Sequence, residues 1–247
     1  MLLRIREAAV IVALLISPQA YAERAVFLLM GQSNAAGMGA LPGTPPTHAD
    51  RIFVYRNSGQ WTPGAEPVDE PDGQVDAVSL DVKSGVGFGV AFADAYATKR
   101  PGVEVGLVPC AKGGSTLARW APHWSRQSLY GSCLARALEA RREGRIAGVL
   151  WWQGEDETSA SAATYGRDLA ATMRALRVDL GDVNLPVVYA RIRGATSITA
   201  VVRTQQEGIA DGPAIMVSTD GIEYPDGWHT DTEGYETVGR RMAGAMP

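Results

Sequence analysis

The sequence predicts an α/β protein in which a mainly parallel sheet is covered by helices on both faces. Short apolar runs alternate along the chain with longer segments of helical periodicity, an order typical of doubly wound α/β sandwiches. The apolar runs are nearly continuous rather than alternating, as in strands that are buried on both faces. With 46% hydrophobic and 20% charged residues in 247, the composition is that of a globular protein.

Six strands and five helices are expected. The strands are Ala25–Met30, Ile52–Tyr55, Val103–Val108, Gly148–Trp152, Pro186–Ile192 and Ala214–Ser218. The helices are Phe88–Thr98, Leu129–Arg142, Ala160–Leu180, Ile198–Ile209 and Glu233–Ala245, and in the third the spacing of Tyr165, Leu169, Met173 and Leu176 indicates one buried face. The stretch from Leu41 to Val86 is rich in Pro, Gly and Asp. We expect it to form a long surface excursion of the same domain, a wall beside the substrate.

Residues 1–22 have the pattern of a secretory signal peptide. Arg4 and Arg6 precede the apolar run Ala8–Ile16, and Ala20-Tyr21-Ala22 forms a small-residue cleavage site. Nine apolar residues make about 14 Å of helix, half of the ~30 Å that a membrane anchor needs. We therefore expect residues 23–247 to be one exported domain, periplasmic or secreted, without a stable membrane anchor.

Charge and composition exclude several classes of protein. The net charge of −4 argues against nucleic acid as a partner. Three scattered histidines and two cysteines predict neither a metal site nor a disulfide scaffold, and no cofactor is expected. In an oxidising compartment Cys110 and Cys133 either form a bridge worth about 3 kcal/mol or stay buried and unpaired. The oligomeric state is not readable from the sequence.

Four polar segments follow strands or precede a helix at the expected carboxyl edge of the sheet, where open parallel sheets bind ligands. The first is Gly31-Gln32-Ser33-Asn34, in which Ser33 is either an exposed nucleophile near oxyanion-binding N–H groups or a helix N-cap. The segment lacks the glycine two residues after the serine that a nucleophile elbow requires. Its glycines do not match dinucleotide spacing either.

The second and third segments offer groups that bind an oxyanion. In Lys112-Gly113-Gly114-Ser115-Thr116 the glycine pair lets backbone N–H groups approach a ligand, although a plain structural turn is the alternative. In Trp151-Trp152-Gln153-Gly154-Glu155-Asp156, Gln153 can direct an amide N–H at an oxyanion and Glu155 can orient a neighbouring group. Glu155 could instead only charge a helix N-terminus. One tryptophan is expected in the core, and the other either there or facing a sugar.

The fourth segment is Asp226-Gly227-Trp228-His229, in which a carboxylate lies three residues before a histidine. A carboxylate on one ring nitrogen fixes the tautomer, so that the other nitrogen can accept a serine proton. Taken alone, a loop histidine is more often solvated. Together, however, the four segments supply every role that acyl transfer requires.

These same segments resemble the four blocks of the SGNH hydrolases. The match is closest to the sialic-acid-specific acetylesterase branch of carbohydrate esterases, which includes acetylxylan esterases, and it spans Leu28 to His229. The resemblance implies a flavodoxin-like three-layer α/β/α fold. It assigns the nucleophile to Ser33, the base to His229 and the orienting acid to Asp226, with Glu155 as the alternative or auxiliary acid. The oxyanion donors it implies are the N–H groups of Ser33 and Gly114 and the side chain of Gln153.

The implied activity is the removal of O-acetyl groups from acetylated carbohydrates of the sialic acid or xylan type by an acetyl-serine mechanism. Two alternatives stay open. An SGNH enzyme could act on lipid or thioester substrates, and it would then prefer long acyl chains. A carbohydrate-binding protein on the same fold would bind sugar without releasing acetate.

Overall fold

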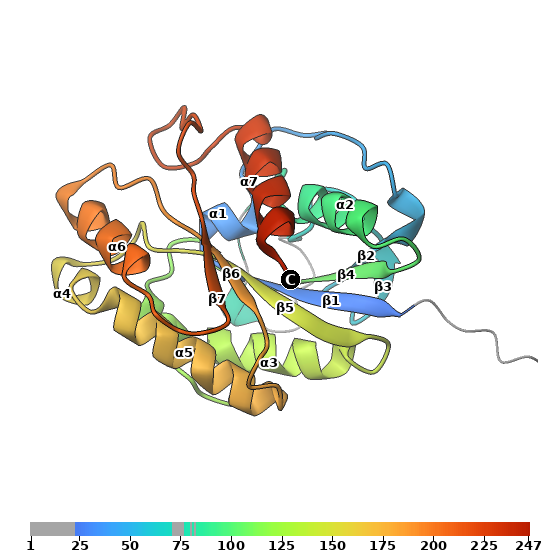
Figure 1. Cartoon of the computed structure of the whole chain (residues 1–247), viewed down its shortest axis with the longest axis horizontal. Helices are drawn as coiled ribbons and strands as arrows, with labels where there is room; N and C mark the ends of the chain where they lie inside the picture. The colour runs from blue at the N-terminus through green and yellow to red at the C-terminus, as the bar shows by residue number, and fades with distance from the viewer. Residues whose placement is uncertain (1–22, 71–76, 80, 82) are drawn as a thin grey trace, which may run out of the picture.

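The computed structural model describes residues 23–247 except 71–76, 80 and 82, and it has the expected three layers (Figure 1). The strands are β1 (Arg24–Gly31), β2 (Ile52–Tyr55), β3 (Trp61–Pro63), β4 (Glu104–Pro109), β5 (Arg145–Trp152), β6 (Val187–Ala190) and β7 (Ala214–Val217). The helices are α1 (Ser33–Ala36), α2 (Gly89–Lys99), α3 (Leu129–Ala140), α4 (Ser159–Ala162), α5 (Tyr165–Leu180), α6 (Ser197–Glu207) and α7 (Thr232–Ala245). Helices α2 and α7 cover one face of the sheet, and α3 and α5 cover the other. The predicted α/β sandwich is confirmed.

The sheet has the strand order β3-β2-β4-β1-β5-β6-β7, and every described pairing is parallel except that of β2 with β3. The chain runs from β1 to β2, returns to β4 beside β1, and then continues on the opposite side of β1 with β5. Successive strands are thus added on one side of β1 first and then on its other side, so the direction of the strand order reverses at β1. Ligand sites in such sheets lie beyond the carboxyl end of the strands at this point, which is where Ser33 begins α1.

Three elements differ from the sequence prediction. The four-residue helix α1 is not among the five expected helices. The helix expected over Ala160–Leu180 is split into α4 and α5, because Thr164 leaves the helical region with φ −118° and ψ 4°. Strand β3 was not predicted. It is a three-residue edge strand ending at Pro63, too short to show a periodicity and of a kind in which proline is tolerated.

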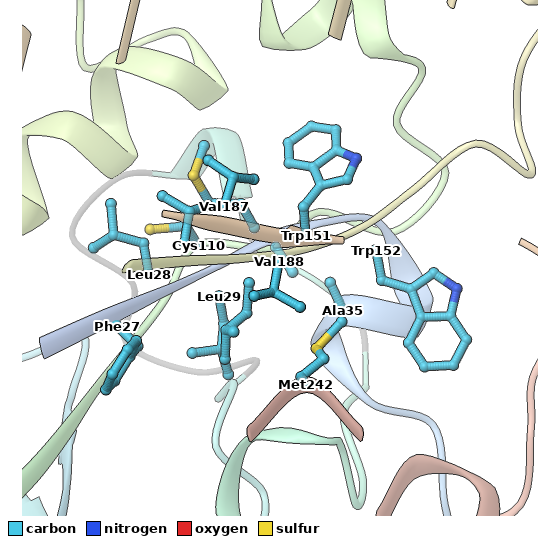
Figure 2. Close-up of a cluster of buried hydrophobic side chains, with 14 of the residues drawn as sticks. Phe27, Leu28, Leu29, Ala35, Cys110, Trp151, Trp152, Val187, Val188 and Met242 are labelled. Atoms are coloured by element: carbon cyan, nitrogen blue, oxygen red, sulfur yellow. The ribbon is translucent and has the colours of Figure 1, made fainter. Parts of the chain in front are cut away.

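The core lies on both sides of β1, whose seven residues from Ala25 onward are all buried. Figure 2 shows the side chains of Trp151 and Trp152 on opposite faces of the sheet, as successive residues of a strand must be. Trp151 packs edge-on against Trp120 with ring centroids 5.4 Å apart, and Trp152 lies 5.7 Å from Tyr235. Both tryptophans are fully buried, so the alternative in which one faces a sugar is wrong.

The structure joins Cys110 and Cys133 in a disulfide with a Cα–Cα distance of 5.3 Å. Cys110 follows β4 and Cys133 lies in α3, and both are buried. The bond ties α3 to the start of the loop that contains Gly113 and Gly114.

The expected signal peptide, residues 1–22, lies outside the described residues. Among the helices of the described residues, none has the length and apolar character needed to cross a bilayer.

Candidate active site

Ser33 is held at the sheet edge by the close approach of β1 and β5. Gly31 has φ 132°, and a Cβ atom there would lie 2.0 Å from the carbonyl oxygen of Trp152. The next residue, Gln32, donates its backbone N–H to that carbonyl at 3.0 Å. Only glycine fits at position 31, and the serine that follows begins α1 at the carboxyl edge of the sheet.

His229 lies between Ser33 and Asp226, as the sequence predicts. Its Nε2 is 2.9 Å from Ser33 Oγ, and its Nδ1 is 2.7 Å from Asp226 Oδ2. The carboxylate partner assigns the proton to Nδ1, which leaves the lone pair of Nε2 free to accept the serine hydroxyl. This is the geometry of a serine nucleophile, a base and an orienting acid.

Asp226 is held in its ionised form by hydrogen bonds from its own turn. Its Oδ1 accepts the backbone N–H groups of Trp228 at 2.8 Å and His229 at 2.6 Å. Desolvation acts to raise the pKa of Asp226, but these bonds and the His229 ring together lower it to about 2. The carboxylate is therefore charged wherever the imidazole can work as a base.

Two side chains from outside this exposed turn fix it in place. Asn34 donates to the carbonyl of Trp228 at 3.0 Å, and Arg193 donates to that of Gly227 at 3.2 Å. Within the same loop, the Thr230 hydroxyl donates to the carbonyl of Glu223 at 2.7 Å, which joins the two ends of the loop. Because Asn34 follows Ser33 in α1, the same helix presents the nucleophile and holds the turn that carries the base.

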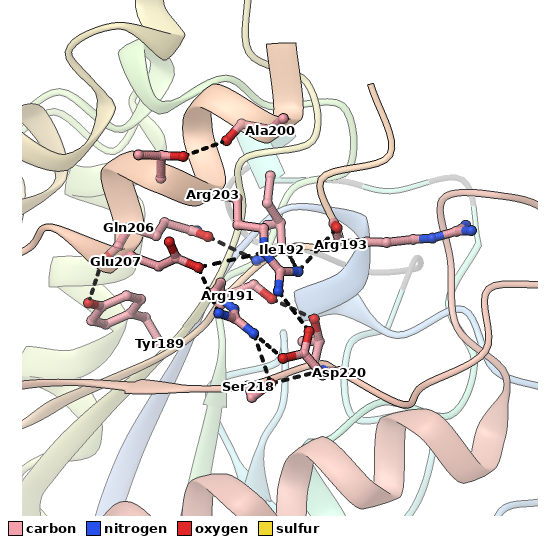
Figure 3. Close-up of polar contacts among 12 residues, drawn as sticks. Tyr189, Arg191, Ile192, Arg193, Ala200, Arg203, Gln206, Glu207, Ser218 and Asp220 are labelled. Carbon is pink, nitrogen blue, oxygen red and sulfur yellow. Dashed lines mark hydrogen bonds and ion pairs between the residues drawn. The ribbon is translucent and has the colours of Figure 1, made fainter. Parts of the chain in front are cut away.

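The loops after β6 and β7 are braced by an ion-pair cluster beside the turn. Figure 3 shows Arg191 and Arg203 converging on Asp220, with Glu207 of α6 on their other side. Arg203 also donates to the backbone carbonyl of Arg193 at 3.2 Å. Arg193, which donates to the Gly227 carbonyl, is thus itself held in place by Arg203.

The backbone N–H groups of Ser33 and Gly114 are placed to bind an oxyanion. The Gly113 N–H donates to Asp81 Oδ2 at 2.8 Å, and the Lys112 ammonium donates to Asp81 Oδ1 at 2.8 Å, which fixes the turn. Gly114 follows with φ 64° and nothing within 4 Å of where a Cβ would lie. Within the described residues no hydrogen bond uses the N–H of Ser33 or of Gly114, and both residues line one cavity.

Gln153 does not occupy the position expected of an oxyanion donor. Its side chain is fully buried, and its amide donates to the carbonyl of Ser115 at 3.0 Å and to Glu157 at 2.7 Å. The Tyr165 hydroxyl lies 2.9 Å from its Oε1. Since an amide has two donor hydrogens, none remains for a substrate. The expectation for Gln153 is corrected: it supports the loop after Gly114 from behind.

Glu155 forms no hydrogen bond with His229 in the described part of the chain. Its Oε1 accepts from Asn34 at 2.8 Å and from the Trp152 indole at 3.1 Å, while its Oε2 has no partner among the described residues. Burial raises the pKa of Glu155 to about 7, although these hydrogen bonds oppose the shift. The structure places Asp226 against the imidazole, and Glu155 reaches the turn only through Asn34. The sequence interpretation assigned no role to Asn34, whose signal was its position directly after Ser33.

The cavity above Ser33 is lined by charged side chains as well as apolar surface. It has a volume of about 500 Å³ and is lined by Gln32, Ser33, Asn34, Met38, Asp81, Lys83, Lys112, Gly113, Gly114, Glu155, Asp156, Trp228 and His229. Five of these side chains carry carboxyl or ammonium groups, whereas large apolar side chains are confined to Met38 and Trp228. Such a lining suits a ligand with many hydroxyl groups.

A three-layer α/β/α domain with a serine, a histidine and an aspartate joined by hydrogen bonds beyond the carboxyl end of its central strand is an SGNH-type hydrolase. Residues 23–247 match the model of the carbohydrate esterase family described as sialic acid-specific acetylesterase, and the chain belongs to that family. It is 31% identical over 242 residues to a probable carbohydrate esterase from Arabidopsis thaliana, with 89% of each chain covered.

The chain is also similar to solved structures. A protein from Arabidopsis thaliana superposes with a TM-score of 0.79 at 28% identity and covers 90% of this chain and 97% of its own. A carbohydrate acetylesterase from Xanthomonas citri has a TM-score of 0.63 at 22% identity and covers 89% of this chain and 54% of its own. The second likeness shows the fold alone.

Proposed function

We propose that this protein is an exported serine esterase that removes O-acetyl groups from carbohydrates of the sialic acid or xylan type. The observation that carries the proposal is the hydrogen-bonded chain from Ser33 through His229 to Asp226, at 2.9 and 2.7 Å. Export is supported by the signal pattern of residues 1–22 and by the disulfide, a bond typical of oxidising compartments.

The reaction has two acyl-transfer steps. His229 takes the proton of Ser33 Oγ as that oxygen attacks the acetyl carbonyl, and the oxyanion is held by the N–H groups of Ser33 and Gly114. His229 then protonates the sugar oxygen as it leaves, which forms acetyl-serine. Water, deprotonated by His229, attacks this ester and releases acetate with the serine restored.

The cavity supports a carbohydrate rather than a long acyl chain. Five of its thirteen lining residues carry ammonium or carboxyl groups, and a long alkyl chain would displace water from these charged groups without replacing its hydrogen bonds. The family description also names an acetylesterase. We therefore expect hydrolysis to fall steeply as the acyl chain of the ester is lengthened beyond acetyl.

The test is acetate release from a panel of acetylated glycans by wild type and Ser33→Ala. We expect Ser33→Ala to lose roughly 10³-fold or more in kcat, because removing the nucleophile of a serine hydrolase abolishes the covalent route. Ser197→Ala, at an exposed serine of α6, is the matched control and should keep full activity. Acetate release that survives in Ser33→Ala, or a preference for esters of eight carbons or more, would overturn the proposal.

A further inference from the structure

His229 lies where two cavities meet. The cavity above Ser33 shares Met38, Lys83 and His229 with a second cavity of about 360 Å³. The second cavity lies between Gly39–Ala40 and the segment Pro225–Glu233. An acetyl group occupies only a small part of the first cavity, so the two together leave room for sugar units on both sides of the reacting ester.

Trp228 combines exposure with a place in the cavity above Ser33. Trp120, Trp151 and Trp152 are fully buried, and Trp124 is 72% exposed but lies outside this cavity, whereas Trp228 is 46% exposed and lines it together with His229. A ligand that occupies this cavity can therefore contact Trp228 next to the catalytic histidine, and aromatic side chains are common in the lining of ligand sites.

Both backbone polar groups of Trp228 are held by hydrogen bonds. Its N–H donates to Asp226 at 2.8 Å and its carbonyl accepts from Asn34 at 3.0 Å. A tryptophan held in this way offers a large, rigid, amphipathic contact area at low conformational-entropy cost. A pyranose ring fits such a surface, because the C–H groups of its face pack on the indole while its hydroxyl groups remain free for Lys83 and Asp156.

We propose that Trp228 is a stacking platform for a sugar unit and that the substrate is an O-acetylated oligosaccharide or polysaccharide that spans both cavities. This inference rests on the proposed esterase function and adds the size of the substrate and a residue that determines specificity. A free acetylated monosaccharide fills one cavity and gains no contacts from the second.

The experiment compares KM and kcat for acetate release from acetylated monosaccharides and from four-unit chains of the same sugar, in the xylose and sialic acid series. Wild type should show a lower KM for the chain in at least one series. Trp228→Ala should raise that KM about tenfold, the equivalent of one aromatic stacking contact, with a smaller change in kcat. Trp228→Phe keeps an aromatic face and should restore most of the affinity.

Trp124→Ala is the matched control, because Trp124 is 72% exposed and bonded to Asp179 outside both cavities. It should leave KM unchanged for every substrate. The inference is overturned if KM is independent of chain length in both series. It is also overturned if Trp228→Ala lowers kcat on p-nitrophenyl acetate as much as it affects the glycan, since Trp228 would then act by holding His229. Failure of the esterase function itself is distinguishable, because wild type would then release acetate from none of these esters.

Discussion

The turn after β5 and the turn before α7 both carry residues of the family motifs, but they are built in opposite ways. Gln153 is fully buried with both donor hydrogens used, and Glu155 is tied to Asn34 and Trp152. In the other turn the side chains of Asp226 and His229 are 57% and 30% exposed, and Nε2 faces Ser33. A side chain that exchanges a proton with a substrate needs a donor or acceptor atom that faces the reacting groups. A buried side chain whose donors are all used can only hold its neighbours in place.

The sharpest test of this contrast compares the two carboxylates. Asp226→Asn should lower kcat for acetate release by about 10³–10⁴-fold, because an amide cannot hold the imidazole in the required tautomer or stabilise its charged form. Asparagine still has an oxygen to accept the backbone N–H groups of the turn, so the unfolding temperature should change little.

Glu155→Gln is the matched substitution at the buried carboxylate. The amide oxygen still accepts from Asn34 and Trp152, so the loss of kcat should be smaller than in Asp226→Asn. Measuring kcat on one acetylated substrate for both variants shows which of the two carboxylates supports His229. If Glu155→Gln is the more damaging change, Glu155 rather than Asp226 is the acid that supports His229.

Gln153→Ala should have a smaller effect than the substitutions of the two carboxylates, and it should act on stability. Replacing Gln153 with alanine removes the side-chain donor to the Ser115 carbonyl and one of the two donors to Glu157, which keeps the backbone N–H of Leu117. The loss should lower the free energy of unfolding by about 1–3 kcal/mol. An oxyanion donor would behave differently, because its loss lowers kcat by about 10²–10³-fold. Urea denaturation together with kcat per folded molecule separates the two roles.

Gln127→Ala, at an exposed glutamine before α3, is the control and should change neither quantity. Unaltered stability with a 10²-fold loss of kcat in Gln153→Ala would restore Gln153 to the oxyanion site.

The features that were predictable from sequence are those set by local pattern. Each buried parallel strand is a short apolar run, so the positions of the strands and of the polar residues after them followed from the sequence. Parallel strands end at one edge of a sheet, which brings Ser33 near the segment before α7. Asp226 and His229 lie three residues apart, so their pairing required no knowledge of the tertiary structure.

The features that were not predictable depend on contacts between distant segments. The side chain of Gln153 contacts Ser115 in the loop after β4, Tyr165 at the start of α5 and Glu157 four residues along its own loop, and nothing beside Gln153 in the sequence indicates the first two. The tryptophans show the same limit. Trp152 and Trp228 each belong to a motif, but Trp152 is buried against Tyr235 whereas Trp228 is 46% exposed, a difference that depends on the tertiary structure.

A third carboxylate extends the comparison to the pH dependence of stability. Asp69 is buried and one of its oxygens has no hydrogen-bond partner among the described residues. Burial, reinforced by the charge of Asp81, raises the pKa of Asp69 to about 8, whereas hydrogen bonds lower that of Asp226. Between the unfolded value of about 4 and 8, the folded chain retains a proton that the unfolded chain has lost. The free energy of unfolding should therefore fall as the pH rises through this window and level off above it.

Asp69→Asn removes this titration, so its stability should decline less than that of wild type between pH 5 and 9. A part of the decline should remain, because burial also raises the pKa values of Glu66 and Glu155 to about 7. Urea unfolding across this range measures the effect, with Asp50→Asn at an exposed position as the control that keeps the wild-type slope. Equal slopes in wild type and Asp69→Asn would mean that Asp69 is ionised in the folded protein at neutral pH, and that its environment resembles that of Asp226 rather than that of Glu155.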